Sequence, residues 1–189
     1  MFFVLLYRRL RYGYTFRRIR LTQGQYAIVD SDDYKSLAEY KWRICKTKGK
    51  NVTYTERSVR LPNGKYSRIL MHRQLMHVPK GYVIDHINGC GLDNRRANLR
   101  LATVAQNAWN SGKRNPRSGY KGVWFAKDKN LWRASIVCNR RRIHLGYFEN
   151  KIEAAKAYGR AAKKLHKEFA VLNFPLKTSP TLRPVLYPH

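Results

Sequence analysis

Hydrophobic and polar positions follow one another in short runs along the first half of the chain, and these runs predict mostly short strands. Residues 52–60 (VTYTERSVR) alternate with the period of a strand, and LPNGK at 61–65 supplies a turn that contains an Asn-Gly pair. YSRIL at 66–70 is predicted to be the returning strand of this hairpin. Apolar runs predict two further strands, at 25–30 and 82–86.

Two helices are predicted in this half from residues that cap helix N-termini. Ser31 or Asp32 precedes the segment DDYKSLAEY, in which apolar residues recur near one helical face. Thr103 is followed three residues later by Gln106, which is the pattern of a capping box. The helix that starts there carries Asn107 in its first turn.

The pattern changes after residues 111–119 (SGKRNPRSG), whose Gly, Pro, Ser and charged residues indicate a linker. Three strand-like runs follow, namely GVWFAK, LWRASIV and RRIHLGYF. Asn150 and Glu153 then form a second capping pattern, at the start of an Ala-rich helix that extends to about Lys167.

Alternation within these three strands separates an apolar face from a basic face. Trp132, Ala134 and Ile136 share one face, and Ile143 and Leu145 are expected to point with them toward the helix, whose small alanines permit close approach. A sheet can enter the major groove of DNA and place arginines on base edges. The opposite face is basic and partly aromatic, with these expected members: Trp124, Arg133, Ser135, Val137, Arg142 and His144.

Composition points to a nucleic-acid partner. The 189 residues include 39 Lys and Arg against 11 Asp and Glu, which gives a formal net charge of +28. Since 43% of the residues are hydrophobic, the chain can form cores and is not a disordered basic tail. The basic residues interleave with aromatic ones, which favours nucleic-acid binding over a generically basic protein such as a ribosomal one. No long basic amphipathic helix supports a membrane-surface role.

The cysteines and the termini add little chemistry. Cys45, Cys90 and Cys138 form no CxxC pair, so neither a zinc ribbon nor a disulfide framework is supported, and a reducing cytoplasm is the expected setting. The apolar start MFFVLLY is too short for a signal-peptide core, and no run reaches the length of a membrane span. Residues 1–20 are therefore expected to form a basic extension or a poorly ordered lead-in, and residues 176–189, with three prolines, a tail.

The segment DHINGCGLDNRRANLRLATVAQN at 85–107 carries the candidate chemistry. Asp85 and Asn107 supply a carboxylate and an amide oxygen, the hard ligands that suit Mg²⁺ or Mn²⁺ completed by water and phosphate. His86 is the candidate general base that takes a proton from the attacking water, and Asn98 is expected to brace the loop. Together they predict metal-assisted hydrolysis of a phosphodiester.

One geometric objection and one alternative stand against this interpretation. Side chains adjacent on a flat strand point to opposite faces, so Asp85 and His86 converge only if the strand ends or twists there. Asn88-Gly89 just downstream favours such an ending. The alternative is a capped loop without chemistry. His72 is a further candidate for contacting the scissile phosphate, although a structural histidine near the site is the favoured interpretation.

The motif DHIN…LDNRRANLR…QN resembles the HNH endonucleases, particularly the phage and intron-associated homing type, over roughly residues 20–110. This resemblance implies a ββα-metal fold, in which two strands precede a helix that delivers the last motif residue. It also implies Asp85 and Asn107 as metal ligands, His86 as general base and Asn98 as the middle residue. The last position is often histidine in the family and is asparagine here. Cys90 matches no family role.

Residues 118–175 resemble the APETALA/ethylene-response-factor domain, in YKGV, IHLGYF, EAAKAYGRAA and LNFP. In that domain a three-stranded sheet reads DNA, which implies DNA contacts by five residues: Trp124, Lys127, Arg133, Arg142 and His144. The family usually has Arg in place of Trp124, Glu in place of Ser135 and Trp in place of His144, so its base preferences do not transfer. Arg140 and Arg141 are equally compatible with a solvated hairpin tip that contacts only phosphates.

The sequence thus predicts an α+β protein of two modules that acts as a metal-dependent DNA endonuclease. The expected parts are a nuclease domain at 21–110, a basic linker at 111–117 and a DNA-binding domain at 118–175. Lys113, Arg114 and Arg117 of the linker are expected either to follow phosphates or to lie in a groove, where the linker becomes ordered on binding.

The expected partner is double-stranded DNA, without a membrane. The expected state is a monomer or weak dimer in the cytoplasm of a bacterium or a phage-infected host. One rival is a non-catalytic DNA-binding regulator that keeps the nuclease scaffold. The other is an RNA-binding structural protein, which the sheet face disfavours because it lacks the exposed aromatic pairs of single-strand platforms.

Overall fold

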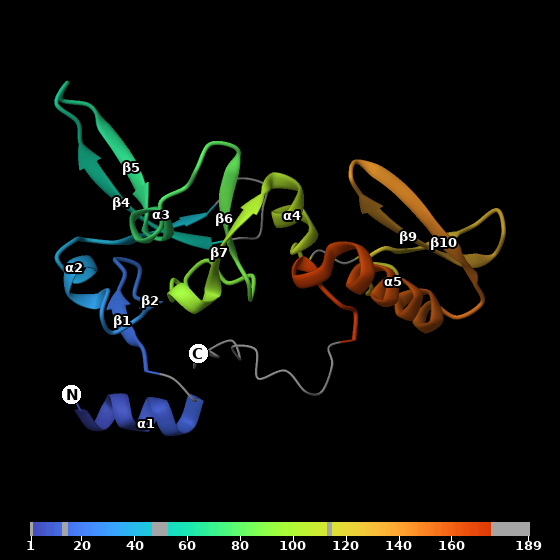
Figure 1. The fold of residues 1–189 in the computed structure, drawn as a ribbon, viewed down its shortest axis with the longest axis horizontal. Coiled ribbons are helices and arrows are strands. Elements are labelled where there is room, and N and C mark those ends of the chain that lie inside the picture. Colours follow the sequence, from blue (N-terminus) through green and yellow to red (C-terminus); the bar gives the residue numbers. More distant parts are fainter. Residues whose placement is uncertain (1, 13–14, 47–52, 113–114, 175–189) are drawn as a thin grey trace. The chain divides into compact units, whose positions relative to one another are not determined.

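The computed structural model describes residues 2–12, 15–46, 53–112 and 115–174, and they form two compact units with a boundary between Leu101 and Ala102. Both units combine helices with small antiparallel sheets (Figure 1), as expected of an α+β protein. No helix among the described residues is long and apolar enough to cross a membrane.

The first unit holds three small sheets, with strand orders β1-β2, β3-β4-β5 and β6-β7. Its short helices lie at the ends of these strands. The elements are α1 (Phe2–Tyr12), β1 (Arg17–Arg20), β2 (Tyr26–Val29), α2 (Tyr34–Ala38), β3 (Arg43–Lys46), β4 (Thr53–Arg60), β5 (Tyr66–Leu70), α3 (Met71–Leu75), β6 (Tyr82–His86), η1 (Arg96–Asn98) and β7 (Leu99–Thr103), which crosses the boundary.

The expectation of a basic extension over residues 1–20 is wrong for its last part. β1 pairs with β2 along its whole length, and Ile19 joins the core of the first unit. Phe16, just before β1, is fully buried as well. Burying these two apolar side chains stabilises the segment, while the arginines beside them stay at the surface. The core of this unit therefore begins several residues before the predicted domain boundary.

Strands β2, β4, β5 and β6 lie close to where the hydrophobic pattern placed them, whereas β7 was not predicted. Trp42 is almost completely buried, and its indole nitrogen donates a hydrogen bond to the Leu37 carbonyl oxygen at 2.7 Å. Helix α2 starts one or two residues later than expected. Its N-cap is Asp33 rather than Ser31 or Asp32, and no side chain caps it.

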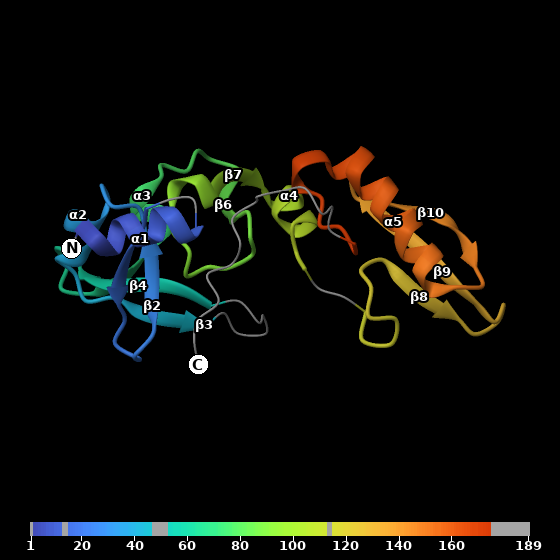
Figure 2. The same cartoon turned by 90° about the horizontal axis from the view of Figure 1, so that it is seen from below.

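The second unit consists of one antiparallel sheet of order β10-β9-β8 with a long helix packed on one face (Figure 2). The bulge in β10 between His144 and Gly146 shifts the register there. The elements are α4 (Val104–Trp109), β8 (Val123–Ala126), β9 (Leu131–Cys138), β10 (Arg141–Phe148), α5 (Lys151–His166) and η2 (Lys167–Phe169).

Small side chains let α5 approach the sheet closely, as the alternation predicted. Ala154 and Ala155 pack with Ala134 of β9, and Leu145 contacts this cluster. Ile143 lies opposite Ile136 in the register and so shares its face, but it remains 39% exposed on the edge strand. The helix N-cap is confirmed, because the Asn150 side chain accepts a hydrogen bond from the backbone N–H of Ile152 at 2.7 Å.

Helix α4 belongs to the second unit. Its N-terminal capping box is confirmed by reciprocal hydrogen bonds between Thr103 and Gln106. At its C-terminal end, Trp109 stacks on His166 with ring centroids 4.4 Å apart and planes 7° from parallel. The Lys121 ammonium donates to the carbonyl oxygen of Trp109. The boundary between compact units thus lies before α4, whereas we expected the first module to end at residue 110.

Part of the expected linker is structured. The Asn115 side chain accepts hydrogen bonds from the backbone N–H groups of Arg117 and Ser118, which forms a turn. The Arg117 guanidinium lies 4.7 Å from the centre of the Phe125 ring. Lys113 and Arg114 lie outside the described residues, as does the expected tail at 176–189.

Candidate active site

Asp85 is the second-last residue of β6, and its carboxylate is held by the neighbouring strand. Its Oδ2 accepts a hydrogen bond from Arg100 Nε at 2.8 Å and forms an ion pair with Arg100 Nη2 at the same distance. Asp85 is only 3% exposed. Since Arg100 lies on β7, the pairing of β6 with β7 positions this carboxylate at the end of its strand.

His86 ends β6 and is surrounded by different neighbours. Its Nε2 lies 3.4 Å from Asn94 Oδ1. The edge-to-face His72 ring is centred 5.1 Å away, and the tilted Tyr54 ring 5.8 Å away. Tyr54 and His72 also contact each other, so three rings from β4, α3 and β6 form one cluster. Two neighbouring residues of a strand thus have separate surroundings, as strand geometry requires.

Burial keeps both histidines uncharged near neutral pH. Desolvation lowers the pKa of His72 to about 3, helped by the nearby His86. Desolvation also lowers the pKa of His86, although the Asn94 hydrogen bond and the Asp93 and Asp85 charges oppose this shift. An uncharged imidazole can accept a proton, which is what a general base must do. The sequence contained His72 but gave no signal of this ring cluster, because its members are distant in the chain.

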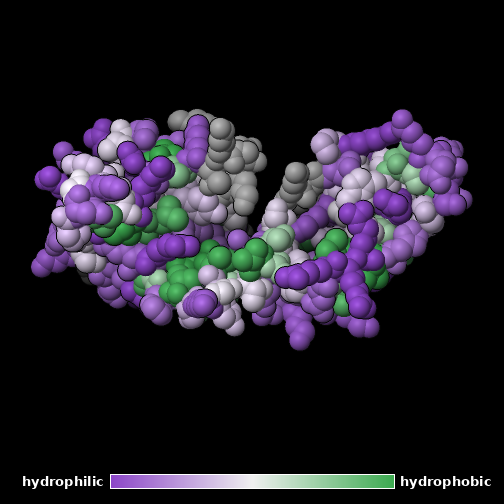
Figure 3. Space-filling view, turned by 90° about the horizontal axis from the view of Figure 1, so that it is seen from above, coloured by the Kyte–Doolittle hydropathy of each residue, from purple (hydrophilic) through white to green (hydrophobic). Residues whose placement is uncertain are grey.

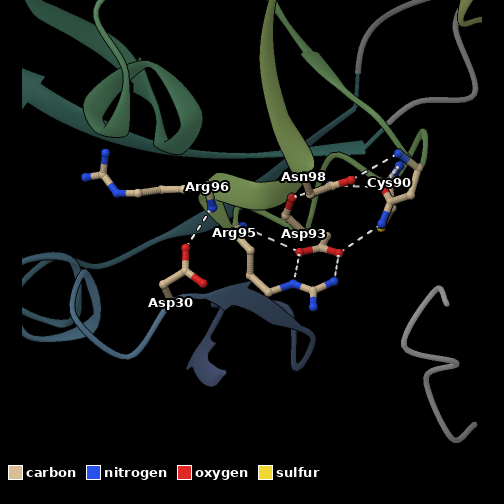
Figure 4. A network of polar contacts seen from close by, with 7 residues as sticks. Asp30, Cys90, Asp93, Arg95, Arg96 and Asn98 are labelled. Atoms are coloured by element: carbon tan, nitrogen blue, oxygen red, sulfur yellow. Dashed lines mark hydrogen bonds and ion pairs between the residues drawn. The ribbon is translucent and has the colours of Figure 1, made fainter. Parts of the chain in front are cut away.

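Asn98 makes the contacts expected of a residue that braces the loop after β6 (Figure 4). It is fully buried, and its Oδ1 accepts a hydrogen bond from the Asn88 backbone N–H at 3.0 Å. Its Nδ2 donates to Asn88 Oδ1 at 3.0 Å and to the Asp93 carbonyl oxygen at 2.7 Å. The side-chain amide therefore ties together both ends of the loop that follows His86.

A buried ion pair supports the same loop, and sequence reasoning gave it no role. Asp93 and Arg95 are each 2% exposed, and Arg95 Nε donates to Asp93 Oδ1 at 2.7 Å. The other carboxylate oxygen of Asp93 accepts a hydrogen bond from Asn88 Nδ2 at 2.9 Å. On the outer side, the backbone N–H of Arg96 donates to Asp30 Oδ2 at 2.7 Å (Figure 4). The sequence did contain a feature that could have predicted this network, namely the dense run of polar residues LDNRRAN.

Asn107 lies on the exposed side of α4, at its fourth residue. It belongs to the second compact unit and Asp85 to the first, so a metal ion shared by these two residues stays a prediction. Among the described residues, no group of three or more His, Cys, Asp or Glu side chains is placed to hold a metal ion.

The expected DNA-binding residues of the second unit gather on the sheet face away from α5. The register places Trp124 and Tyr147 on either side of Arg133, and His144 opposite Ser135. The Arg142 guanidinium lies 5.8 Å from the centre of the Trp124 ring. Tyr147 was not among the expected members. The bulge in β10 brings it to this face, where its ring centre lies 4.7 Å from that of His144.

The remaining expected contact, Lys127, is exposed in the turn that follows β8. Lys129 of the same turn places its ammonium 5.3 Å from the Tyr147 ring centre, so it also borders the sheet face. The face therefore combines cations with aromatic rings, as DNA-binding sheets do.

Comparison with known proteins identifies HNH endonucleases as relatives of this chain. A family model described as HNH endonuclease matches residues 76–109. The uncharacterized HNH endonuclease L560 of Acanthamoeba polyphaga mimivirus is 29% identical over 80% of this chain and 76% of its own length. Protein 3.8 of Escherichia phage T7 is 34% identical over 49% of this chain and 77% of its own length. No solved structure matches the chain.

Proposed function

Since this chain belongs to the family of phage T7 protein 3.8 and carries an HNH endonuclease domain, we propose that it is a metal-dependent DNA endonuclease. The observation that supports this most strongly is a buried, uncharged histidine next to a carboxylate at the end of β6, followed by a loop fixed by Asn98. In the catalytic assignment His86 acts on the attacking water, and Asn98 positions the loop beside it. The reaction is hydrolysis of a phosphodiester bond.

His86 is the general base of this proposal. Its lowered pKa leaves the ring able to take a proton from the attacking water at neutral pH. Asn94 contacts Nε2 and orients the ring, and Asn98 holds the loop on which Asn94 and Asn88 lie. The edge of His72 limits how far the imidazole can turn.

Asp85 and Asn107 are the proposed metal ligands. One carboxylate and one amide are both hard oxygen donors, so the donor set fits Mg²⁺ or Mn²⁺ completed by water and phosphate. The ion pair with Arg100 holds the Asp85 carboxylate at the end of β6. When bound, the metal supplies stabilisation of the negative charge on the reacting phosphate.

The second unit is the proposed DNA-binding module, since the sequence of residues 118–175 resembles the APETALA/ethylene-response-factor domain. Its basic sheet face, with Arg133, Arg142 and His144, binds the duplex, and the linker residues Lys113, Arg114 and Arg117 contact phosphates. By the resemblance of its DHIN…LDNRRANLR…QN motif to the HNH endonucleases, the protein is of the homing type found in phages and mobile elements.

Cleavage of supercoiled plasmid DNA in the presence of Mg²⁺ or Mn²⁺ tests the catalytic assignment. We expect nicking or linearisation by the wild-type protein and none in EDTA. His86→Ala should reduce the rate by about 10²- to 10⁴-fold, the usual contribution of general base catalysis. His77→Ala, which changes an exposed histidine after α3, is the matched control and should cleave normally. Undiminished cleavage by His86→Ala would exclude it as the base.

DNA affinity tests the sheet face separately. We expect Arg142→Ala and Arg133→Ala each to weaken binding to a duplex about tenfold and to reduce the slope of log affinity against log salt by about 1. Arg160→Ala, on the exposed side of α5, removes the same charge from the other side of the sheet and serves as the control. Equal affinity of the sheet-face variants and wild type at fixed salt would refute this assignment.

The alternative function is a non-catalytic DNA-binding regulator that retains the nuclease scaffold. The observation in its favour is the close pairing of Asp85 with Arg100, which already compensates the charge that a metal ion would neutralise. The same plasmid assay separates the two functions. A regulator binds the duplex with full affinity and leaves it intact with every metal ion tested.

A further inference from the structure

Strands β4 and β5 extend beyond the core of the first unit as a hairpin (Figure 1). Their pairing continues to Arg60 and Tyr66 at the outer end. The turn is closed by hydrogen bonds from Leu61 N–H to the Lys65 carbonyl oxygen at 2.8 Å and from Gly64 N–H to the Leu61 carbonyl oxygen at 2.9 Å. Gly64 has a φ of +78°, which only glycine adopts readily. The projection is therefore a defined ribbon, and the nuclease assignment gives it no role.

The outer part of this hairpin is basic. No Asp or Glu occurs between residues 57 and 70, while Arg60, Lys65 and Arg68 occur there and are exposed. The nearest acidic side chain in the strands is Glu56, which is buried and pairs with Arg43 at 3.0 Å and with Arg68 only at 3.9 Å. Hydrophilic residues also cover most of the face of the molecule that Figure 3 shows. The hairpin thus presents charge that the described residues leave largely uncompensated.

Two of these cations share one face of the ribbon with an aromatic ring. The register places Arg60 directly opposite Tyr66 and Ser58 opposite Arg68. Because side chains two residues apart lie on the same face of a strand, these four residues form one surface. Tyr66 is 74% exposed, which is far more than an aromatic ring with only a structural role needs.

The base of the hairpin is anchored, unlike its tip. The Arg57 guanidinium lies 3.9 Å from the centre of the Tyr40 ring, and its Nε donates to Gln74 Oε1 at 2.8 Å. Arg57 is therefore committed to the fold, whereas Arg60, Lys65 and Tyr66 extend into solvent. A rigid base with an exposed cationic and aromatic tip is suited to contact a partner without rearrangement.

We propose that the β4–β5 hairpin is a second DNA-binding surface, which enters the major groove of the duplex with Arg60, Tyr66 and Arg68 facing the bases and the sugar-phosphate backbone. This inference rests on the proposed function for the identity of the partner. The major groove admits a two-stranded ribbon, and a polyanion complements a face with two exposed arginines, whose nearest carboxylate in the strands, Glu56, is buried at the base of the hairpin. The protein then contacts DNA through a separate surface in each unit, and its recognition site includes base pairs read by the hairpin.

The test compares two triple variants of the full chain that remove the same charge. One is Arg60→Ala/Lys65→Ala/Arg68→Ala in the hairpin, and the other changes the exposed α5 residues Lys156, Arg160 and Lys163 to alanine. With a mixed-sequence duplex, the hairpin variant should bind at least tenfold more weakly than wild type. The slope of log affinity against log salt should also become shallower by about 2 to 3, since each phosphate contact contributes about 0.9 to this slope. The α5 variant should change affinity less than twofold. Equal losses in both variants, or none in the hairpin variant, would overturn the proposal.

Photochemical cross-linking tests the groove. A duplex that carries 5-iodouracil presents the iodine in the major groove, and irradiation joins it to a nearby aromatic side chain. We expect mass spectrometry to find a cross-linked peptide that contains Tyr66, and Tyr66→Ala to lose that peptide alone. Cross-links confined to the second unit would contradict a major-groove role for the hairpin.

Plasmid cleavage run in parallel separates the two proposals. If the hairpin variant loses affinity for DNA while the wild-type protein cleaves no plasmid, the hairpin proposal is supported and the nuclease proposal is refuted. Wild-type cleavage with a hairpin variant that binds and cleaves normally would refute the hairpin alone. Preservation of the first unit in the variant is checked by hydrogen exchange of β2 and β6, which lie outside the hairpin.

Discussion

The two units bury different kinds of side chain. The first unit buries an ion pair and several more polar residues around the loop after β6, including His72, Asp85, His86 and Asn98. In the second unit the core between α5 and the sheet is made chiefly of alanines and Tyr158, and among its described residues no Asp, Glu, Lys or Arg side chain is buried. Buried polar groups are costly unless they are paired, so the first unit is organised around fixed polar positions. The second unit is organised around close packing and presents its charged groups to solvent.

The largest expected effect is a loss of stability of the first unit when the Asp93 carboxylate is removed. Asp93→Ala leaves the buried Arg95 guanidinium without its partner and also removes the acceptor of the Asn88 amide. Breaking one side of a buried pair costs about 3–5 kcal/mol, which is a large part of the stability of a domain. Hydrogen exchange should show that β2 and β6 lose protection while β9 retains it.

The control for this prediction is Asp128→Ala, which removes an exposed carboxylate from the turn after β8. It should change the stability of neither unit by more than about 0.5 kcal/mol. Equal exchange in the first unit of Asp93→Ala and wild type would mean that the buried pair does not hold the loop, and the contrast between the units would fail.

Short-range patterns predicted the larger part of the fold. The β4–β5 hairpin was predictable because strand alternation and the Asn-Gly turn act over neighbouring residues. β1 and β7 were not predicted. In β1 the single buried residue Ile19 stands among arginines, so its place depends on pairing with β2 rather than on its own sequence. The placement of α4 in the second unit also depends on a distant contact, between Trp109 and His166.

The same limit applies to the candidate site. Asp85, His86 and Asn98 were found because their spacing is local. Their partners were not found, because the contacts of Arg100 with Asp85 and of His72 with His86 depend on how strands and helices distant in sequence meet. On the sheet face, the bulge that adds Tyr147 has no signal in simple alternation.

Close packing in the second unit predicts a strong effect at Gly122. A Cβ atom added there would lie 2.0 Å from Tyr158 Cδ2, and the φ of Gly122 is +73°. Gly122→Ala therefore combines backbone strain of about 1–2 kcal/mol with overpacking of about 1–3 kcal/mol. Chemical denaturation followed by hydrogen exchange of β9 measures the loss.

Gly119→Ala is the matched control, because Gly119 has a φ of +76° but no atom within 4 Å of an added Cβ. It should show the backbone strain alone. If the two variants were equally stable, the core of the second unit would be looser than its small residues indicate, and close packing would no longer distinguish the two units.

The smallest expected difference between the two units is in how much stability each loses in acid. For the first unit this loss follows from the burial of His72. Its pKa is lowered from 6.5 to about 3 by burial, so between these values the unfolded chain binds a proton that the folded first unit does not. The free energy of unfolding of this unit is therefore constant above about pH 6.5 and falls as the pH drops toward 3, by at most about 1.4 kcal/mol per pH unit. Between pH 7 and pH 5 this amounts to roughly 2 kcal/mol. His72→Phe keeps a ring against Tyr54 and His86 but removes the titrating group, so it should reduce the loss by about that amount.

Hydrogen exchange of β6 and of β9, measured at pH 7 and pH 5 and corrected for the intrinsic exchange rates, compares the acid-induced loss of stability in the two units. The second unit buries one histidine, His166, whose pKa is also lowered by desolvation but is raised in part by a hydrogen bond to the Val137 carbonyl oxygen. It should therefore lose less protection in acid than the first unit. His77→Phe, at an exposed position, should leave the acid response of wild type unchanged. An unchanged response in His72→Phe would show that burial of His72 does not determine the acid response of the first unit.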